Sequence, residues 1–97
     1  MVQPINFNKD DFEKRIASYL TFGSELKFIS KIDGKEIEDL GFLISASENY
    51  VLIAQSKIGE NEFSAITSIY LKNVTQYYIY NIPEKRQDKD HNLFMDV

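Results

Sequence analysis

The chain contains two segments that differ in the spacing of their apolar residues. Between residues 7 and 23 apolar side chains recur at spacings of four, three and one, which places them on one face of a helix. Between residues 26 and 80 short apolar runs alternate with polar positions and are separated by turn residues, a pattern typical of strands. The helical stripe consists of Phe12, Ile16, Tyr19 and Leu20.

The helical segment carries a start signal and a stop signal. Asn8 is a good N-cap, because its side-chain oxygen accepts a hydrogen bond from a free amide of the first turn. Phe7 precedes this cap and Phe12 follows four residues later, which is the spacing of a hydrophobic staple. Gly23 suits the left-handed conformation that often ends a helix. We therefore predict a helix over about residues 9–22.

The remaining pattern predicts a mainly β fold of the α+β class. Asp33-Gly34 is a dipeptide typical of two-residue hairpin turns, and Gly41 lies where the second strand is expected to bend sharply. We expect the N-terminal helix to be followed by a five-stranded, strongly bent antiparallel sheet or small open barrel, Sm-like or SH3-like. The expected strands cover about residues 26–32, 35–46, 50–55, 63–71 and 74–80.

Length and composition indicate one domain without special chemistry. We expect residues 1–82 to form that domain and residues 83–97 to form a mobile, charged tail, in which Leu93-Phe94-Met95 is an apolar segment with two interpretations, a docking peptide or a frayed end. The chain has no cysteine, and its single histidine, His91, lies in this tail. No nucleophile–base pair, phosphate loop or metal-ligand spacing occurs. We expect a protein that is not an enzyme and uses no cofactor or metal.

The balance of charge limits the classes of partner. The formal net charge is −4, so a bulk electrostatic attraction to DNA or RNA is disfavoured, although a local basic pocket remains compatible with it. No signal-peptide pattern and no apolar run of membrane-spanning length occurs, so we expect a cytoplasmic protein.

The layout of the chain resembles the Sm-like family from about Phe12 to Tyr80. Residues 26–34 look like the first strand and turn of that family, and residues 40–44 (Leu-Gly-Phe-Leu-Ile) are similar to its bent second strand. Asn49-Tyr50-Val51-Leu52 resembles the end of its first signature. The resemblance implies a small open barrel that assembles into rings and binds RNA.

Three signature positions depart from the Sm-like pattern. Ser45 replaces an acid, Glu48 replaces an aromatic or apolar residue, and Lys72-Asn73 stands in place of Arg-Gly in the last turn. These positions would clamp a base and a phosphate, so the resemblance bears on the fold more than on the activity. SH3-like barrels, OB-like barrels and pleckstrin-like sheets share strands and turns of this kind.

Four residues are candidates for RNA binding. Asn49, Tyr50, Lys72 and Asn73 offer a ring for stacking and a cation for phosphate. The structural alternative is that both asparagines serve turn geometry and that Tyr50 packs on a sheet face.

Tyrosines and acids form the candidates for protein binding. Tyr78 and Tyr80 are expected on one face of the last strand and Tyr77 on the other, so at least one aromatic face is partly exposed unless something covers it. Cross-strand packing is the structural alternative for the tyrosines, and a solvated edge is the alternative for the acids. The full set is Tyr70, Tyr77, Tyr78, Tyr80, Glu36, Glu38 and Asp39.

These patterns support two hypotheses of different classes. The first is a non-enzymatic Sm-like binding and assembly module, which contacts RNA and associates with copies of itself through the edges of the last two strands. The second is an acidic protein-binding partner, of the inhibitor or immunity type, whose tyrosine face and acids mask a basic target. Neither hypothesis involves a membrane or a small-molecule cofactor.

Overall fold

A computed structural model describes residues 2–59 and 62–83 of the chain. The predicted tail, with His91 and Leu93-Phe94-Met95, lies outside the described residues apart from Pro83, and so do residues 60 and 61, between the strands predicted at 50–55 and 63–71.

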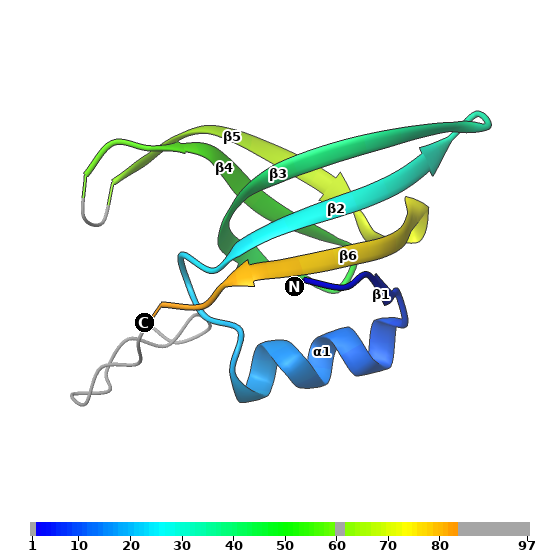
Figure 1. Cartoon of the computed structure of the whole chain (residues 1–97), viewed down its shortest axis with the longest axis horizontal. Helices are drawn as coiled ribbons and strands as arrows, with labels where there is room; N and C mark the ends of the chain where they lie inside the picture. Colours follow the sequence, from blue (N-terminus) through cyan, green and yellow to red (C-terminus); the bar gives the residue numbers. More distant parts are fainter. Residues whose placement is uncertain (1, 60–61, 84–97) are drawn as a thin grey trace.

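The described residues form one helix and a single antiparallel sheet of six strands in the order β1-β6-β2-β3-β4-β5 (Figure 1). The last strand of the chain, β6, thus pairs with the first long strand, β2, on one side and with the short N-terminal strand β1 on the other. The elements are β1 (Ile5–Asn6), α1 (Lys9–Ser18), β2 (Glu25–Ile32), β3 (Lys35–Ala46), β4 (Tyr50–Lys57), β5 (Phe63–Tyr70), the 3-10 turn η1 (Leu71–Asn73) and β6 (Val74–Asn81).

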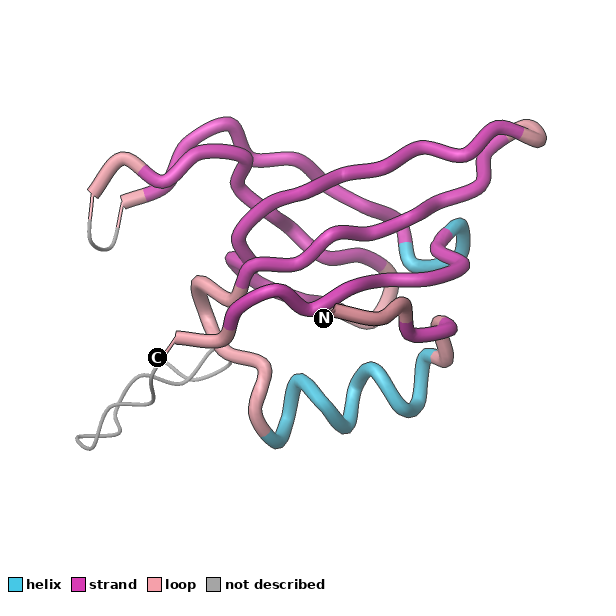
Figure 2. The backbone as a smooth tube through the Cα atoms, in the orientation of Figure 1, coloured by secondary structure: helices cyan, strands magenta, loops and turns pink. Residues whose placement is uncertain are grey.

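Two details of the predicted fold need correction: the number of strands and the barrel alternative. The sheet has six strands instead of five, because Ile5 and Asn6 pair with Tyr77 and Gln76; a two-residue strand carries no periodic signal. Of the two predicted alternatives, the open sheet is found and the barrel is not, because β6 pairs with β2 and β1, and β5 pairs with β4 alone among the described residues. The mainly β α+β class and the strong curvature of the strands are confirmed (Figure 2).

The predicted start of the helix is confirmed. The Asp11 N–H donates to Asn8 Oδ1 at 2.9 Å, so Asn8 is the N-cap. The rings of Phe7 and Phe12 lie 5.5 Å apart between centroids, which is the predicted staple.

The helix ends at Ser18, four residues earlier than predicted. Beyond it the backbone is held by Ser24: the Thr21 N–H donates to Ser24 Oγ at 3.1 Å, and the Ser24 N–H donates to the Thr21 carbonyl at 3.0 Å. Gly23, at φ +87°, then donates its N–H to the Leu43 carbonyl at 2.7 Å. These bonds to a side chain and to β3 replace further helical bonds, and residues such as serine and threonine readily offer such competition.

The helix covers one face of the curved sheet, and the core lies between them (Figure 1). An apolar helix face is stable only when it is buried against another element, which the sheet supplies here. Leu20 belongs to this core although it follows the helix. The core contains Phe12, Ile16 and Leu20 from the helical segment and, from the sheet, Leu26, Phe28, Leu43, Val51, Ile53, Ile69 and Tyr77.

Glycines have two different roles in the β2–β3 hairpin, of which the tight turn is confirmed. Asp33 and Gly34 both have positive φ, +53° and +79°, which the two-residue turn between β2 and β3 requires. Gly41 lies where β3 passes closest to β4: a Cβ at this position would meet the Ala54 carbonyl oxygen at 2.7 Å and Ile53 Cδ1 at 2.9 Å. The close approach of β3 to β4 at this point therefore depends on the missing side chain of Gly41.

Candidate functional site

Three of the four predicted RNA-binding residues meet at the end of the sheet where β4 begins and β5 ends. The hairpin register places Tyr50 opposite Tyr70, and their rings lie 6.2 Å apart in an edge-to-face arrangement. The Leu71 N–H donates to the Asn49 carbonyl at 2.9 Å, so η1 is fixed beside the β3–β4 turn. Because Lys72 follows on η1, it lies near Asn49 and Tyr50 in space as well.

Asn49, Tyr70 and Lys72 border a groove of about 560 Å³ between the start of α1, the β3–β4 turn and η1. Its floor is apolar, and three different elements supply its polar groups. The rim offers two ammonium groups, an amide, a carboxylate and a phenol ring. The floor is formed by Phe7, Leu71 and Val74, and the rim by Lys9, Glu48, Asn49, Tyr70 and Lys72.

The groove is locally basic although the protein is acidic. Two lysines face one glutamate in it. Lys9 Nζ lies 3.9 Å from Glu48 Oε2, and both side chains are solvent-exposed, so this ion pair is weak and easily exchanged. Lys72 is exposed and forms no ion pair within residues 2–59 and 62–83. Among the described residues, an anion in the groove therefore meets the Lys72 ammonium group without an ion pair to displace and the Lys9 ammonium group in a weak surface ion pair.

Of the four predicted RNA-binding residues, Asn49 and Lys72 line the groove, whereas Tyr50 and Asn73 do not. Tyr50 packs its ring against Tyr70, which does line the groove. Asn73 ends η1 and is half-buried. Of the predicted protein-binding residues, Tyr70 thus belongs to this groove.

Tyr78 and Tyr80 form a second aromatic surface, on the outer face of β6. Their rings stack nearly parallel, 6.0 Å apart with an interplanar angle of 7°. Lys27 Nζ lies 4.7 Å from the centre of the Tyr78 ring and 3.6 Å from Glu38 Oε1. A hydrogen bond with Tyr80, and more weakly the charge of Glu38, raises the pKa of Lys27. We call Lys27, Glu38, Tyr78 and Tyr80 the outer tyrosine face.

The rest of the predicted protein-binding set is dispersed. Tyr77 points the opposite way from Tyr78, as the alternation predicts, but it is completely buried in the core and cannot contribute to a binding surface. Glu36 lies opposite Lys31 near the exposed tip of the β2–β3 hairpin, and Asp39 is half-buried on β3. The three acids therefore do not act as one cluster.

Sequence reasoning missed two lysines that belong to these surfaces. Lys9 stands next to the predicted N-cap, but no local pattern shows that the N-terminal segment returns to η1. Alternation along the strand places Lys27 on the face opposite to Leu26. That Lys27 lies beside Tyr78 follows only from the pairing of β2 with β6.

A second groove, of about 410 Å³, lies on the other side of the β3–β4 turn. Phe12, Ile16 and Ala46 make it largely apolar, and Glu13, Ser47 and Glu48 supply its polar edge. Among the described residues no group of three or more acidic, histidine or cysteine side chains is placed to hold a metal ion. None of the helices in this part of the chain has the length and apolarity needed to cross a membrane.

Comparisons of the chain with protein-family models, curated proteins and solved structures gave no match.

Proposed function

We propose that this protein is a non-enzymatic binding and assembly module of the Sm-like kind. Its groove holds a nucleotide of single-stranded RNA, and the edge of β5 and the second half of β6, which β1 leaves uncovered, pair with neighbouring chains. The observation that carries the proposal is the convergence of Asn49, Tyr70, Lys9 and Lys72 on one groove with an apolar floor.

Each group in the groove matches one part of a nucleotide. An exposed tyrosine ring offers a stacking surface for a base, and base–aromatic stacking contributes roughly 1–3 kcal/mol in single-strand binding proteins. The two ammonium groups suit phosphate oxygens, and the Asn49 amide has both a donor and an acceptor for a base edge. A tyrosine 55% exposed at the mouth, as Tyr70 is, can accept such stacking without rearrangement of the core.

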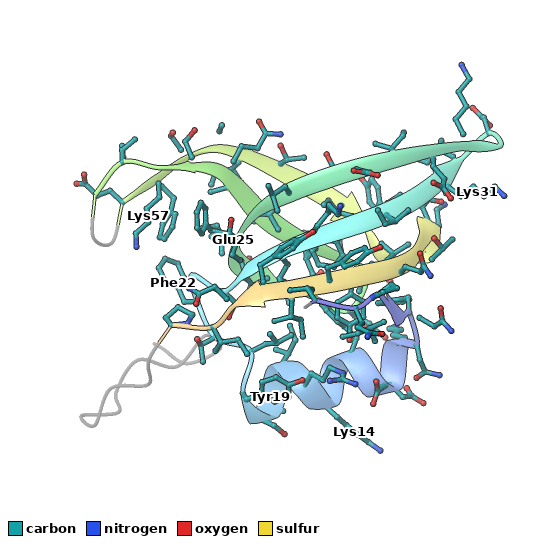
Figure 3. The ribbon with its side chains drawn as sticks, in the orientation of Figure 1. Lys14, Tyr19, Phe22, Glu25, Lys31 and Lys57 are labelled. Atoms are coloured by element: carbon teal, nitrogen blue, oxygen red, sulfur yellow. The ribbon has the colours of Figure 1, made fainter. Side chains whose placement is uncertain are left out.

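The experiment is an NMR titration of the protein with oligo-U and oligo-A at low salt. We expect amide shifts at Asn49, Tyr70 and Lys72. We expect Lys72→Gln to weaken binding about 5- to 10-fold, because one charged contact to phosphate is worth about 1 kcal/mol. Lys57→Gln is the matched control, because Lys57 is exposed at the far end of β4 (Figure 3).

Two results would contradict RNA binding in the groove. One is the absence of amide shifts up to high micromolar RNA. The other is an equal loss of affinity in the Lys72 and Lys57 variants, which would show that only overall charge matters.

The outer tyrosine face favours a second candidate function, binding of a basic protein. Parallel rings with one cation already above Tyr78 offer an aromatic surface on which a guanidinium group also stacks. An arginine-rich peptide is the probe: this candidate predicts amide shifts at Tyr78 and Tyr80 that Tyr80→Ala abolishes. Shifts confined to the acidic tip around Glu36, or none at all, would remove it.

A further inference from the structure

Strand β5 exposes an unprotected edge. Within residues 2–59 and 62–83 it pairs with β4 alone. Natural edge strands are usually shielded by charged residues or proline, yet residues 63–71 contain neither. One irregularity is present: Ala65 has φ +60°, which bends the first part of the strand. The regular edge therefore runs from Ile66 to Tyr70.

The opposite edge of the sheet is partly covered. Ile5 and Asn6 of β1 pair with Tyr77 and Gln76 of β6, and the Phe7 N–H donates to the Thr75 carbonyl at 2.9 Å. The outer backbone groups of β6 are thus already occupied over its first half. The two edges of the sheet are not equivalent, and β5 is the more open one.

The side chains of the regular β5 segment are self-complementary about its central residue. Ile66, Ser68 and Tyr70 lie opposite Ala54, Leu52 and Tyr50 of β4 and share the outer face with them. Ile66 is 50% exposed and Tyr70 is 55% exposed. If a second β5 lies antiparallel beside the first, Ile66 faces Tyr70, Ser68 faces Ser68 and Tyr70 faces Ile66. No like charges come into contact in this arrangement.

We propose that β5 pairs antiparallel with β5 of a second copy of the chain, about a two-fold axis at Ser68. Ile66 of each copy then faces Tyr70 of the other, and the two sheets continue into one. This pairing rests on the assembly part of the proposed function and narrows it, because it selects a closed dimer over head-to-tail association of β5 with β6. Since Tyr70 also lines the groove, the second copy reaches the groove wall.

The dimer is expected to be weak. Stable protein interfaces bury about 1,200–2,000 Å² in total, and a five-residue strand pair with two Ile–Tyr contacts falls at or below the low end. Pairing by strand addition gains main-chain hydrogen bonds, and its specificity comes from alternate side chains. The association should therefore depend on concentration.

A single cysteine tests both the symmetry and the register, because the natural chain has none. Directly opposed residues in an antiparallel pair have Cα atoms about 4.5–5.5 Å apart, within the range a disulfide spans. Ser68→Cys should give a covalent dimer under mild oxidation at high protein concentration. Ser56→Cys is the matched control, because Ser56 is exposed on β4 and away from the edge. Ser68→Lys, which opposes two like charges at the axis, should give a monomer in sedimentation experiments and keep the native amide spectrum.

Three results would overturn the inference. Equal cross-linking of the Ser68 and Ser56 variants would show random collision. A ring-sized or open-ended mass that Ser68→Cys does not trap as a dimer would indicate head-to-tail pairing, and the assembly part of the proposed function would stand without the two-fold register. A monomer at every concentration would remove both, whereas RNA binding in the groove is decided separately by the titration.

Discussion

At the scale of single residues, Gly41 is the glycine at which an added side chain meets the closest neighbour. A Cβ would approach a backbone oxygen of β4 at 2.7 Å, and a backbone neighbour cannot turn aside as a flexible side chain can. We expect Gly41→Ala to lower the free energy of unfolding by about 1–3 kcal/mol, the usual cost of overpacking. Urea unfolding monitored by circular dichroism measures it.

Ala65→Gly is the matched opposite change. Ala65 is held at φ +60°, a conformation that costs roughly 1–2 kcal/mol for a residue with a Cβ. Glycine removes this strain but adds entropy to the unfolded chain, so we expect a small net gain in stability, up to about 1 kcal/mol. Similar losses in both variants would contradict the roles assigned to the two positions.

Tyr77 is a second residue with a measurable energetic signature. Its hydroxyl is buried and has no hydrogen-bond partner among the described residues, and burial raises its pKa to about 12. The folded state therefore favours the protonated phenol. Stability is complete below pH 10, where the unfolded tyrosine is also protonated, and decreases as pH rises from 10 towards 12. We expect a loss on the order of 2 kcal/mol over this window.

Tyr77→Phe separates this effect from the titration of other groups. The phenylalanine keeps the ring packing but has no proton to lose, so the difference in unfolding free energy between the two proteins isolates Tyr77. We expect the variant to be as stable as the natural protein or more stable at pH 8, because a buried hydroxyl without a partner is unfavourable. Its advantage should grow between pH 10 and 11.5. A constant difference across this range would contradict the buried phenol.

At the scale of elements, the start of α1 depends on one hydrogen bond. Asn8 Oδ1 accepts from the Asp11 amide at 2.9 Å, so Asn8→Ala should destabilise the protein by about 1 kcal/mol. Asn8→Asp keeps an acceptor oxygen and should retain most of the stability. Thermal unfolding of the three proteins measures the effect, and equal losses in both variants would show that the cap contributes nothing.

The elements that the sequence predicts well are those specified by neighbouring residues. The Asp33-Gly34 turn and the strand boundaries follow from local alternation and turn chemistry. The early end of α1 does not follow from local pattern. It depends on a hydrogen bond within the loop to the Ser24 side chain and on one to β3, which is distant in sequence. The two-residue β1 is equally invisible, since only its pairing with β6 makes it a strand.

The candidate site shows the same division. Asn49, Tyr50 and Lys72 were proposed from their likeness to Sm-like signature positions, and the β4–β5 hairpin places the start of β4, next to Asn49, beside the end of β5. Lys9 was missed because its place depends on how α1 packs across the sheet. Tyr77 was correctly placed opposite Tyr78, but alternation alone does not say which of the two faces the helix covers.

At the scale of the whole molecule, the proposed RNA complex sets a net charge of −4, which opposes the approach of RNA, against the two lysines of the groove. Binding then depends on very few local contacts. With two lysines available, the logarithm of the RNA affinity should fall with the logarithm of salt concentration with a slope no steeper than about −1.4, and Lys72→Gln should reduce this slope by about 0.7. Fluorescence anisotropy with labelled oligo-U between 20 and roughly 200 mM salt measures both.

Glu48→Gln changes the same balance in the opposite direction. It removes the carboxylate that pairs with Lys9 and lies in the groove, so a bound phosphate no longer competes with it or is repelled by it. We expect RNA affinity to increase a few-fold at low salt, since exposed charge contacts contribute roughly 0.2–1 kcal/mol. Glu13→Gln alters the net charge equally but lies in the neighbouring groove. An equal gain in both variants would show that RNA senses the charge of the whole protein and that the groove does not bind it.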